Sequence, residues 1–133
     1  MHSTKARILY TEDDPDSREV LTEVLKRNGY EVVWTEDTPS ALQLCRQELF
    51  DLILLDNWTP IMDGCTLTGK IREFDQVTPI LFYSGAATKS DFNAAKAAGA
   101  QGYLTKPTGI DQLTDEIDGL ILKSRLQKNH IPH

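Results

Sequence analysis

The apolar run at residues 52–55 constrains the fold of this chain more than any other stretch, because it ends abruptly at an acid, Asp56. Four apolar residues without polar alternation are typical of a strand that is buried on both faces, as in the middle of a parallel sheet. Asp56 would then lie at the carboxyl end of a central strand, the edge of an open α/β sheet at which ligands bind. A carboxylate there is a candidate nucleophile or metal ligand, although Asp also commonly starts a turn.

The rest of the chain alternates short apolar runs with segments of helical period. Strands are expected at residues 7–10, 31–35, 52–55, 79–83 and 101–105. The third helix is expected to begin near Cys65 or Thr66, after a turn that contains Asp63 and Gly64. Five strands alternating with five helices favour an α/β fold, a doubly wound five-stranded parallel sheet with helices on both faces.

The apolar positions of the expected helices predict which side chains face the core. In the first three helices these positions include Val20, Leu49 and Phe74. Asp14, followed by a proline, is expected to cap the first helix, and Thr38, again followed by proline, begins the second in the same way. The helices should therefore pack through one apolar stripe each.

Length and charge limit the classes of protein that this chain can belong to. Its 133 residues fit one domain, with a core at about residues 6–124 and a loose tail at residues 125–133. A net charge of −6 argues against direct binding of nucleic acid. There is no apolar stretch of membrane-spanning length, and Cys45 and Cys65 lack metal-binding or redox spacing. The reducing cytoplasm is the expected location.

Polar side chains stand at the carboxyl ends of four expected strands. They are Glu12 and Asp13 after the first strand, Asp56 after the third, Ser84 after the fourth and Lys106 after the fifth. All these ends meet at one edge of a parallel sheet, so we expect the side chains to lie close together. Clustered carboxylates repel one another unless a cation or proton neutralises them. An open, all-oxygen site of this kind suits Mg²⁺.

Such a site can perform phosphoryl transfer to a carboxylate. A carboxylate beside Mg²⁺ can attack a phosphoryl group and form an acyl phosphate, while the metal and a lysine neutralise the phosphoryl oxygens. The sequence contains neither the P-loop motif nor a Gly-x-Gly-x-x-Gly motif after its first strand. The three histidines, at positions 2, 130 and 133, lie in expected frayed ends, so no Ser/His or Cys/His constellation is available.

Three motifs in combination resemble the receiver domain of two-component response regulators, from about residue 7 to residue 124. They are Ile-Leu-Tyr-Thr-Glu-Asp-Asp-Pro, Asp-Leu-Ile-Leu-Leu-Asp followed by Pro-Ile-Met-Asp-Gly, and Ala-Gly-Ala-Gln-Gly-Tyr-Leu-Thr-Lys-Pro. The resemblance implies a flavodoxin-like (βα)5 fold with strand order 2-1-3-4-5. It also implies Mg²⁺ as the cofactor.

The resemblance assigns a role to each site residue. It implies Asp56 as phosphoacceptor, Glu12 and Asp13 as the acidic pair that holds Mg²⁺, the backbone carbonyl of Trp58 as a further metal ligand, Lys106 as phosphate contact, Ser84 as switch hydroxyl, Tyr103 as switch aromatic and Pro107 as the site of a cis peptide bond. Of the acidic pair, Asp13 is the expected direct ligand.

The expected function is that of a receiver which a histidine kinase or a phosphotransfer protein phosphorylates. Phosphorylation would change the surface of the fourth helix, fifth strand and fifth helix, where a protein target or a second copy of the chain could dock. The only chemistry expected is phosphorylation and dephosphorylation of the chain itself, so it is not expected to be an enzyme. No nucleic acid or membrane partner is expected.

Other hypotheses remain open at this level. The chain could be a single-domain regulator, or a receiver excised from a hybrid histidine kinase or a multidomain regulator. A phosphohydrolase with an aspartyl nucleophile would want a second Asp two residues after the first, where this sequence has Trp58. A receiver-like binding module that is never phosphorylated would not need the full set of site residues.

Overall fold

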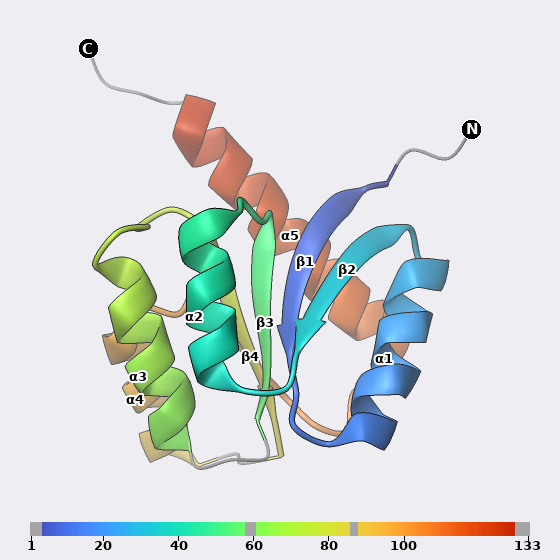
Figure 1. The fold of residues 1–133 in the computed structure, drawn as a ribbon, viewed down its shortest axis with the longest axis horizontal. Helices are drawn as coiled ribbons and strands as arrows, with labels where there is room; N and C mark the ends of the chain where they lie inside the picture. The colour runs from blue at the N-terminus through green and yellow to red at the C-terminus, as the bar shows by residue number, and fades with distance from the viewer. Residues whose placement is uncertain (1–3, 58–60, 86–87, 130–133) are drawn as a thin grey trace.

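The computed structural model describes residues 4–57, 61–85 and 88–129. Strands and helices alternate in the order β1 (Ala6–Thr11), α1 (Pro15–Arg27), β2 (Tyr30–Thr35), α2 (Thr38–Gln47), β3 (Leu52–Asn57), α3 (Ile61–Arg72), β4 (Ile80–Ser84), α4 (Lys89–Ala98), β5 (Gly102–Thr105) and α5 (Ile110–Asn129). The strands form one parallel sheet in the order β2-β1-β3-β4-β5. Figure 1 shows helices on both faces of this sheet. The predicted fold class and strand order are confirmed.

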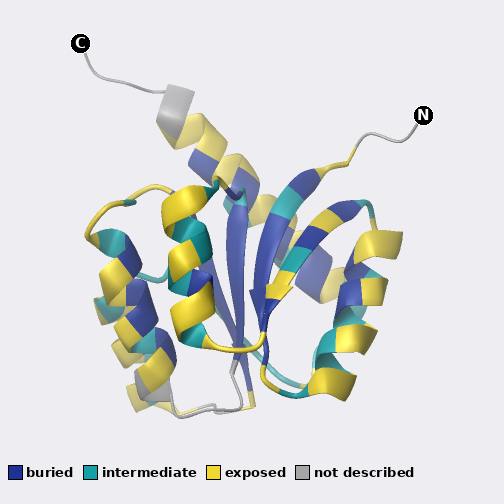
Figure 2. Cartoon of the chain, viewed as in Figure 1, coloured by how far each residue is buried: buried dark blue, intermediate teal, exposed yellow. Residues whose placement is uncertain are grey.

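Two apolar clusters, one on each face, hold the sheet. One joins the strands to α1 and α5, and the other joins them to α2, α3 and α4. Successive residues of β1 alternate between the two, with Ile8 and Tyr10 in the first cluster and Leu9 in the second. Residues 52–56 of β3 are all buried, and Figure 2 shows the burial along the central strands. The central position of β3 therefore fixes Asp56 at the rim of the core.

Short polar side chains begin the helices. Asp14 caps α1 as predicted, and its carboxylate accepts a hydrogen bond from the amide of Ser17 at 2.9 Å. The cap of α2 is Asp37, one residue before the predicted Thr38, and its carboxylate accepts from the amide of Ser40 at 2.7 Å. A carboxylate at the cap also interacts favourably with the helix dipole, so the acid is preferred to the neighbouring hydroxyl.

The predicted start of α3 is wrong. The helix begins at Ile61, so Asp63 and Gly64 lie within it and not in a turn. Gly64 is buried, and its carbonyl accepts a hydrogen bond from the Thr68 hydroxyl at 2.8 Å. Packing against the sheet therefore outweighs the low helix propensity of glycine at this position.

The predicted loose tail from residue 125 is also wrong in part, because α5 continues to Asn129. Contacts at the far edge of the sheet explain this extension. Ser124 is buried and its hydroxyl donates to the carbonyl of Val77 at 3.2 Å, while Arg125 pairs with Asp51 at 3.5 Å.

No helix within the described ranges is long and apolar enough to cross a membrane.

Three apolar side chains that were expected to face the core are exposed. Val20 is 64% exposed, Leu49 is 87% exposed and Phe74 is 41% exposed. Leu49 and Phe74 lie beyond the ends of α2 and α3, where the helical period no longer sets the direction of a side chain. The ring of Phe74 is covered by the guanidinium of Arg46, 4.8 Å from its centroid.

Candidate functional site

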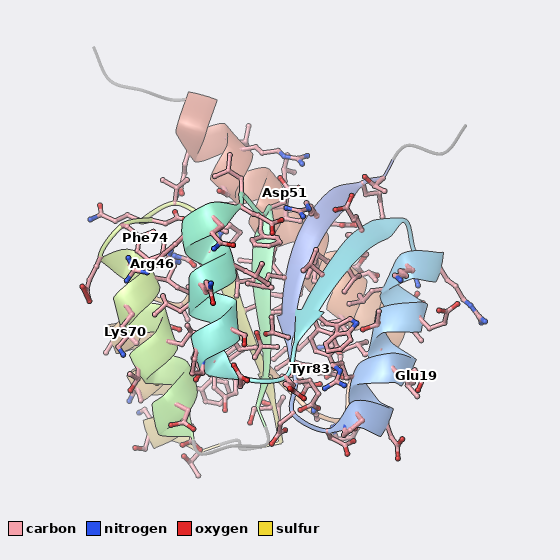
Figure 3. All side chains as sticks on the ribbon, viewed as in Figure 1. Glu19, Arg46, Asp51, Lys70, Phe74 and Tyr83 are labelled. Atoms are coloured by element: carbon pink, nitrogen blue, oxygen red, sulfur yellow. The ribbon has the colours of Figure 1, made fainter. Side chains whose placement is uncertain are left out.

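The predicted site residues do converge at the carboxyl edge of the sheet, the lower edge in Figure 1. The parallel register places Asp56 beside Tyr83 and Ser84 beside Thr105. In Figure 3, Tyr83 lies toward this edge, whereas Asp51, which precedes β3, lies at the opposite edge. The topology alone thus brings the ends of β1, β3, β4 and β5 together.

Asp56 lies at the centre of the site and is only 6% exposed. Its Oδ1 atom forms an ion pair with the ammonium of Lys106. Its Oδ2 atom accepts a hydrogen bond from the hydroxyl of Tyr10 at 2.9 Å. Each carboxylate oxygen therefore has a different neighbour, a cation on one side and a neutral donor on the other.

Lys106 is held by the backbone that surrounds it. Its amide donates to the carbonyl of Ser84 at 2.9 Å, which joins the end of β5 to the end of β4. The peptide bond from Lys106 to Pro107 is cis, as the sequence resemblance implied. The ammonium also lies 5.2 Å from the centroid of the Tyr83 ring. These contacts direct the lysine toward Asp56.

Glu12 is a buried acid, and only one of its two carboxyl oxygens has a hydrogen-bond partner among the described residues. It is 1% exposed, and its Oε1 atom has no hydrogen-bond partner among the described residues. Burial, together with the negative charge of Asp56, raises the pKa of Glu12 to about 8. Such a carboxyl group stays protonated at neutral pH unless a cation approaches it. Asp13, the next residue, is exposed at the mouth of the site.

A cavity of about 360 Å³ opens beside these acids. The described residues that line it include six acids and no base: Glu12, Asp13, Glu36, Asp37, Asp56 and Asp63. Its negative lining and its opening toward solvent favour a cation with its own water ligands.

The carboxylates of the site are the type of ligand that Mg²⁺ prefers, although they do not surround one common point among the described residues. Glu12 Oε1 is a buried oxygen that accepts no hydrogen bond from the described residues, and the neighbour of Asp56 Oδ1 is the ammonium of Lys106. Among the described residues, no three His, Cys, Asp or Glu side chains are placed to hold a metal together. Mg²⁺ commonly takes one or two carboxylates and keeps several waters, so the acids present are sufficient. The fourth predicted ligand, the carbonyl of Trp58, lies outside the described residues.

The two predicted switch residues are also brought together. Ser84 is 2% exposed. Burial raises the pKa of Tyr103, and a hydrogen bond with Ser84 opposes this increase. The Tyr103 ring stacks on the Phe82 ring with centroids 5.9 Å apart. It also packs at a tilt against the ring of Phe92 in α4, with centroids 4.3 Å apart. The hydroxyl of β4 is thus linked through one aromatic ring to α4.

Two tyrosines of the site were missed by the sequence analysis. Tyr10 and Tyr83 were interpreted only as apolar members of their strands. A buried tyrosine usually finds a partner for its hydroxyl, so a Tyr near the acid-bearing end of a central strand was the available signal.

The family model of the response regulator receiver domain matches residues 8–118. The chain belongs to this family. The match covers most of the chain and confirms the resemblance seen in the three motifs. It includes the whole of the edge that Glu12, Asp56, Ser84 and Lys106 occupy.

Relatives of this receiver domain occur in two kinds of protein. The transcriptional activator protein PfeR of Pseudomonas aeruginosa is 34% identical over 122 residues, which cover 92% of this chain and 40% of PfeR. The sensor histidine kinase AruS of the same organism is 40% identical over 110 residues, which cover 80% of this chain and 11% of AruS. The chain thus spans less than half of either relative.

Solved structures of similar fold come from the same two kinds of protein, a sensor histidine kinase and a response regulator. A receiver domain of a sensor histidine kinase from Pseudomonas aeruginosa PAO1 has a TM-score of 0.79 and 29% identity, covering 87% of this chain and 97% of that chain. That structure holds a magnesium ion in its active site cleft. A two-component response regulator of the LuxR family from Aurantimonas has a TM-score of 0.83 and 31% identity, covering 91% and 87%.

Proposed function

We propose that this receiver domain accepts a phosphoryl group on Asp56 from the phosphohistidine of a histidine kinase or a phosphotransfer protein. The observation that supports this most directly is the buried Asp56 carboxylate, which pairs with Lys106 and opens onto a cavity lined by acids. A buried carboxylate with a cation on one side and oxygen ligands on the other is suited to attack phosphorus.

The geometry favours Oδ1 as the attacking atom, since it is the oxygen beside Lys106. As the Oδ1–P bond forms, the N–P bond of the phosphohistidine breaks and its electron pair stays on the imidazole. The ammonium of Lys106 can then move from the carboxylate to a phosphoryl oxygen. It neutralises charge on that group both during and after the transfer.

We assign the Mg²⁺ site to Glu12, Asp13 and Asp56, with the carbonyl of Trp58 as a further expected ligand. When bound, the metal would supply positive charge that offsets the negative phosphoryl oxygens. The unpartnered Oε1 of Glu12 supports this assignment, because a buried carboxylate oxygen requires compensation. The magnesium-bound receiver described above supports the choice of ion.

The switch would act through Ser84, Tyr103 and α4. A phosphoryl group on Asp56 would attract the Ser84 hydroxyl, which now interacts with Tyr103. Tyr103 packs against Phe92 of α4, so a change at Ser84 is transmitted to the surface formed by α4, β5 and α5. This is a population shift, because the phosphoryl group favours the conformation in which it has more partners.

The remaining assignments follow from this role. The chemistry begins and ends on the chain itself, so we do not assign an enzymatic activity on a separate substrate. We expect a cytoplasmic location, where phosphohistidine is formed, and a protein target or a second copy of the chain docking on the switched surface. Relatives in both a transcriptional activator and a sensor kinase support two contexts, a response regulator or a hybrid kinase.

The test is phosphorylation by acetyl phosphate in the presence of Mg²⁺, followed by mass spectrometry. The wild-type domain should gain one phosphoryl group and Asp56→Asn should gain none. Asp51→Asn is a matched control, because it makes the same change immediately before the same strand, at the opposite edge of the sheet. If Asp56→Asn gains the same mass as the wild type, the acceptor is another residue.

A further inference from the structure

The hydroxyl of Tyr10 touches the carboxylate that the proposed function places at the centre of the reaction. Tyr10 is 0% exposed, and its hydroxyl donates to Oδ2 of Asp56 at 2.9 Å. Its neighbours in the same apolar cluster include Ile8 and Leu54, which fill the same face with aliphatic side chains. Packing alone therefore does not require a hydroxyl at this position.

The two oxygens of Asp56 have separate partners. Lys106 pairs with Oδ1, on the side from which the phosphoryl group would approach, and Tyr10 donates to Oδ2. If Oδ1 is phosphorylated, Oδ2 becomes the carbonyl oxygen of the acyl phosphate and can keep its hydrogen bond. Tyr10 would then contact the reacting group before, during and after the transfer.

We infer that Tyr10 is a further active-site residue, which shortens the lifetime of the phosphoryl group on Asp56 by stabilising the carboxylate that is released. This inference rests on the proposed function of Asp56 as phosphoacceptor. It concerns the step that resets the domain.

The hydroxyl can act only as a donor here. A phenol keeps its proton at neutral pH and an ionised carboxylate has none to donate, so the hydrogen bond runs from Tyr10 to Oδ2. Removing the hydroxyl would leave Oδ2 without its phenol donor. The ring would remain in place, and the gap left by one oxygen atom is too small to admit a water molecule freely.

The strength of this hydrogen bond depends on the charge of Oδ2. A hydrogen bond to an ionised carboxylate is roughly twice as strong as one between neutral groups. The bond is therefore stronger when Asp56 is a free carboxylate than when it is an acyl phosphate with a neutral carbonyl. Tyr10 favours whichever state carries more negative charge on the carboxyl group.

This difference affects hydrolysis more than phosphorylation. In hydrolysis, the oxygen of water bonds to phosphorus and the Oδ1–P bond breaks. The electron pair stays on Oδ1, and the protons of the water pass to phosphate and solvent. A loose transition state places most of this charge on the leaving carboxylate. The hydrogen bond from Tyr10 is therefore stronger in the transition state of hydrolysis than in the acyl phosphate.

In phosphorylation, the carboxylate is charged both at the start and in a loose transition state. The hydrogen bond then has nearly the same strength in both, and such uniform binding does not change the rate of the chemical step. Tyr10 should therefore affect the two directions unequally. A residue that only supports the fold would not produce this asymmetry.

The experiment compares Tyr10→Phe with Tyr30→Phe as a matched control. Tyr30 is also buried, at 2% exposure, and its hydroxyl also donates to a carboxylate, that of Asp118. It stands at the start of β2, at the edge of the sheet away from the site. Both variants therefore remove one buried hydroxyl bonded to an acid, but only one of them acts on Asp56.

Two rates are measured in Mg²⁺, the rate of phosphorylation by acetyl phosphate and the rate of phosphoryl loss from purified phosphoprotein. Tyr10→Phe should lengthen the phosphoryl lifetime about fivefold to tenfold, which corresponds to roughly 1 to 1.4 kcal/mol in barrier. Its rate of phosphorylation should change by a smaller factor than its rate of phosphoryl loss. Tyr30→Phe should leave both rates within about twofold of the wild-type values.

The ¹³C chemical shift of the Asp56 carboxyl carbon gives an independent readout. It should move in unphosphorylated Tyr10→Phe and not in Tyr30→Phe. An unchanged shift would mean that the hydrogen bond is absent in solution, and the inference would fall.

The kinetic outcomes also separate this inference from the proposed function. A Tyr10→Phe lifetime equal to or shorter than that of the wild type would overturn the inference. A parallel fall in both rates, or a folded variant that accepts no phosphoryl group, would do the same. In these cases the role of Asp56 stands, provided that the wild type is phosphorylated and Asp56→Asn is not. If the wild type accepts no phosphoryl group, the proposed function fails first.

Discussion

Arg72, the last residue of α3, is predicted to be a major source of stability for the half of the domain that carries α4. Its guanidinium donates to the carbonyls of Gly99 at 3.0 Å, Asp75 at 2.8 Å and Thr78 at 2.8 Å. It also donates to the side-chain oxygen of Gln101 at 2.7 Å. One side chain therefore joins the end of α3 to the loop before β4 and to the connection between α4 and β5.

The substitution Arg72→Met would remove these hydrogen bonds and keep most of the aliphatic stem. A hydrogen bond from a charged donor contributes about 1.5–3 kcal/mol, but burial of the guanidinium offsets part of the total and lowers the pKa of Arg72. Gly99 and Asp75 are only half-buried, so their carbonyls can recover water, whereas Thr78 is buried. We therefore expect a loss of about 3 kcal/mol in the free energy of unfolding, dominated by the unpaired carbonyl of Thr78.

Urea unfolding followed by circular dichroism measures this loss directly, and the melting temperature should fall by about 10 °C. Arg27→Met is the control, because Arg27 pairs with Glu23 at 3.5 Å on the exposed face of α1. That exposed pair should contribute less than about 0.5 kcal/mol. A loss below about 1 kcal/mol for Arg72→Met would show that water replaces the guanidinium at all of its acceptors, and the reasoning would be wrong.

Two further predictions concern single acids. Burial raises the pKa of Asp75, but hydrogen bonds from Thr78 and Val77 outweigh it and the pKa is lowered overall. Stability from this group is present above the unfolded pKa of about 4 and is lost as the pH falls through the folded pKa. Asp75→Asn should thus have a lower free energy of unfolding than the wild type at pH 7, and this difference should shrink in acid. Urea unfolding at pH 7 and in acid measures the difference, and a difference that does not change with pH would contradict the prediction. Glu12→Gln should raise the Mg²⁺ concentration that half-saturates phosphorylation by acetyl phosphate by about tenfold, and chelation of Mg²⁺ should stop the reaction. An unchanged half-saturation would remove Glu12 from the metal site.

The strands could be predicted because apolar runs indicate buried strands and turn residues mark their ends, whereas the strand order followed from the resemblance to the receiver family. The run at residues 52–55 is buried as predicted, and the acid that follows it lies at the site. Element ends were less predictable, since they depend on contacts that lie far away in sequence. The extension of α5 rests on Val77 and Asp51, residues at least 47 positions away from their partners, and no local pattern near residue 125 indicates them.

The same distinction between local pattern and distant contacts applies to the residues of the candidate site. Residues that follow a strand, such as Asp56 and Lys106, could be placed from the sequence because parallel topology carries all strand ends to one edge. The hydrogen-bond partner of Tyr10 could not be assigned in this way, because Tyr10 lies inside a strand and its partner depends on the register between two strands. The structure pairs Tyr10 with Leu54, two residues before Asp56.

That register has a consequence for how the site can vary among chains that share this fold. The ring of Tyr10 extends along the face of the sheet from a position level with Leu54, so its hydroxyl reaches the carboxylate two residues further on. Phenylalanine at the same position would keep the packing of the ring and would leave Oδ2 without this donor. One core position on β1 can therefore alter the environment of Asp56 without changing any residue of the exposed rim. By this argument, the rate of phosphoryl loss can be set from inside the sheet, independently of the loops on which the phosphodonor and the metal depend.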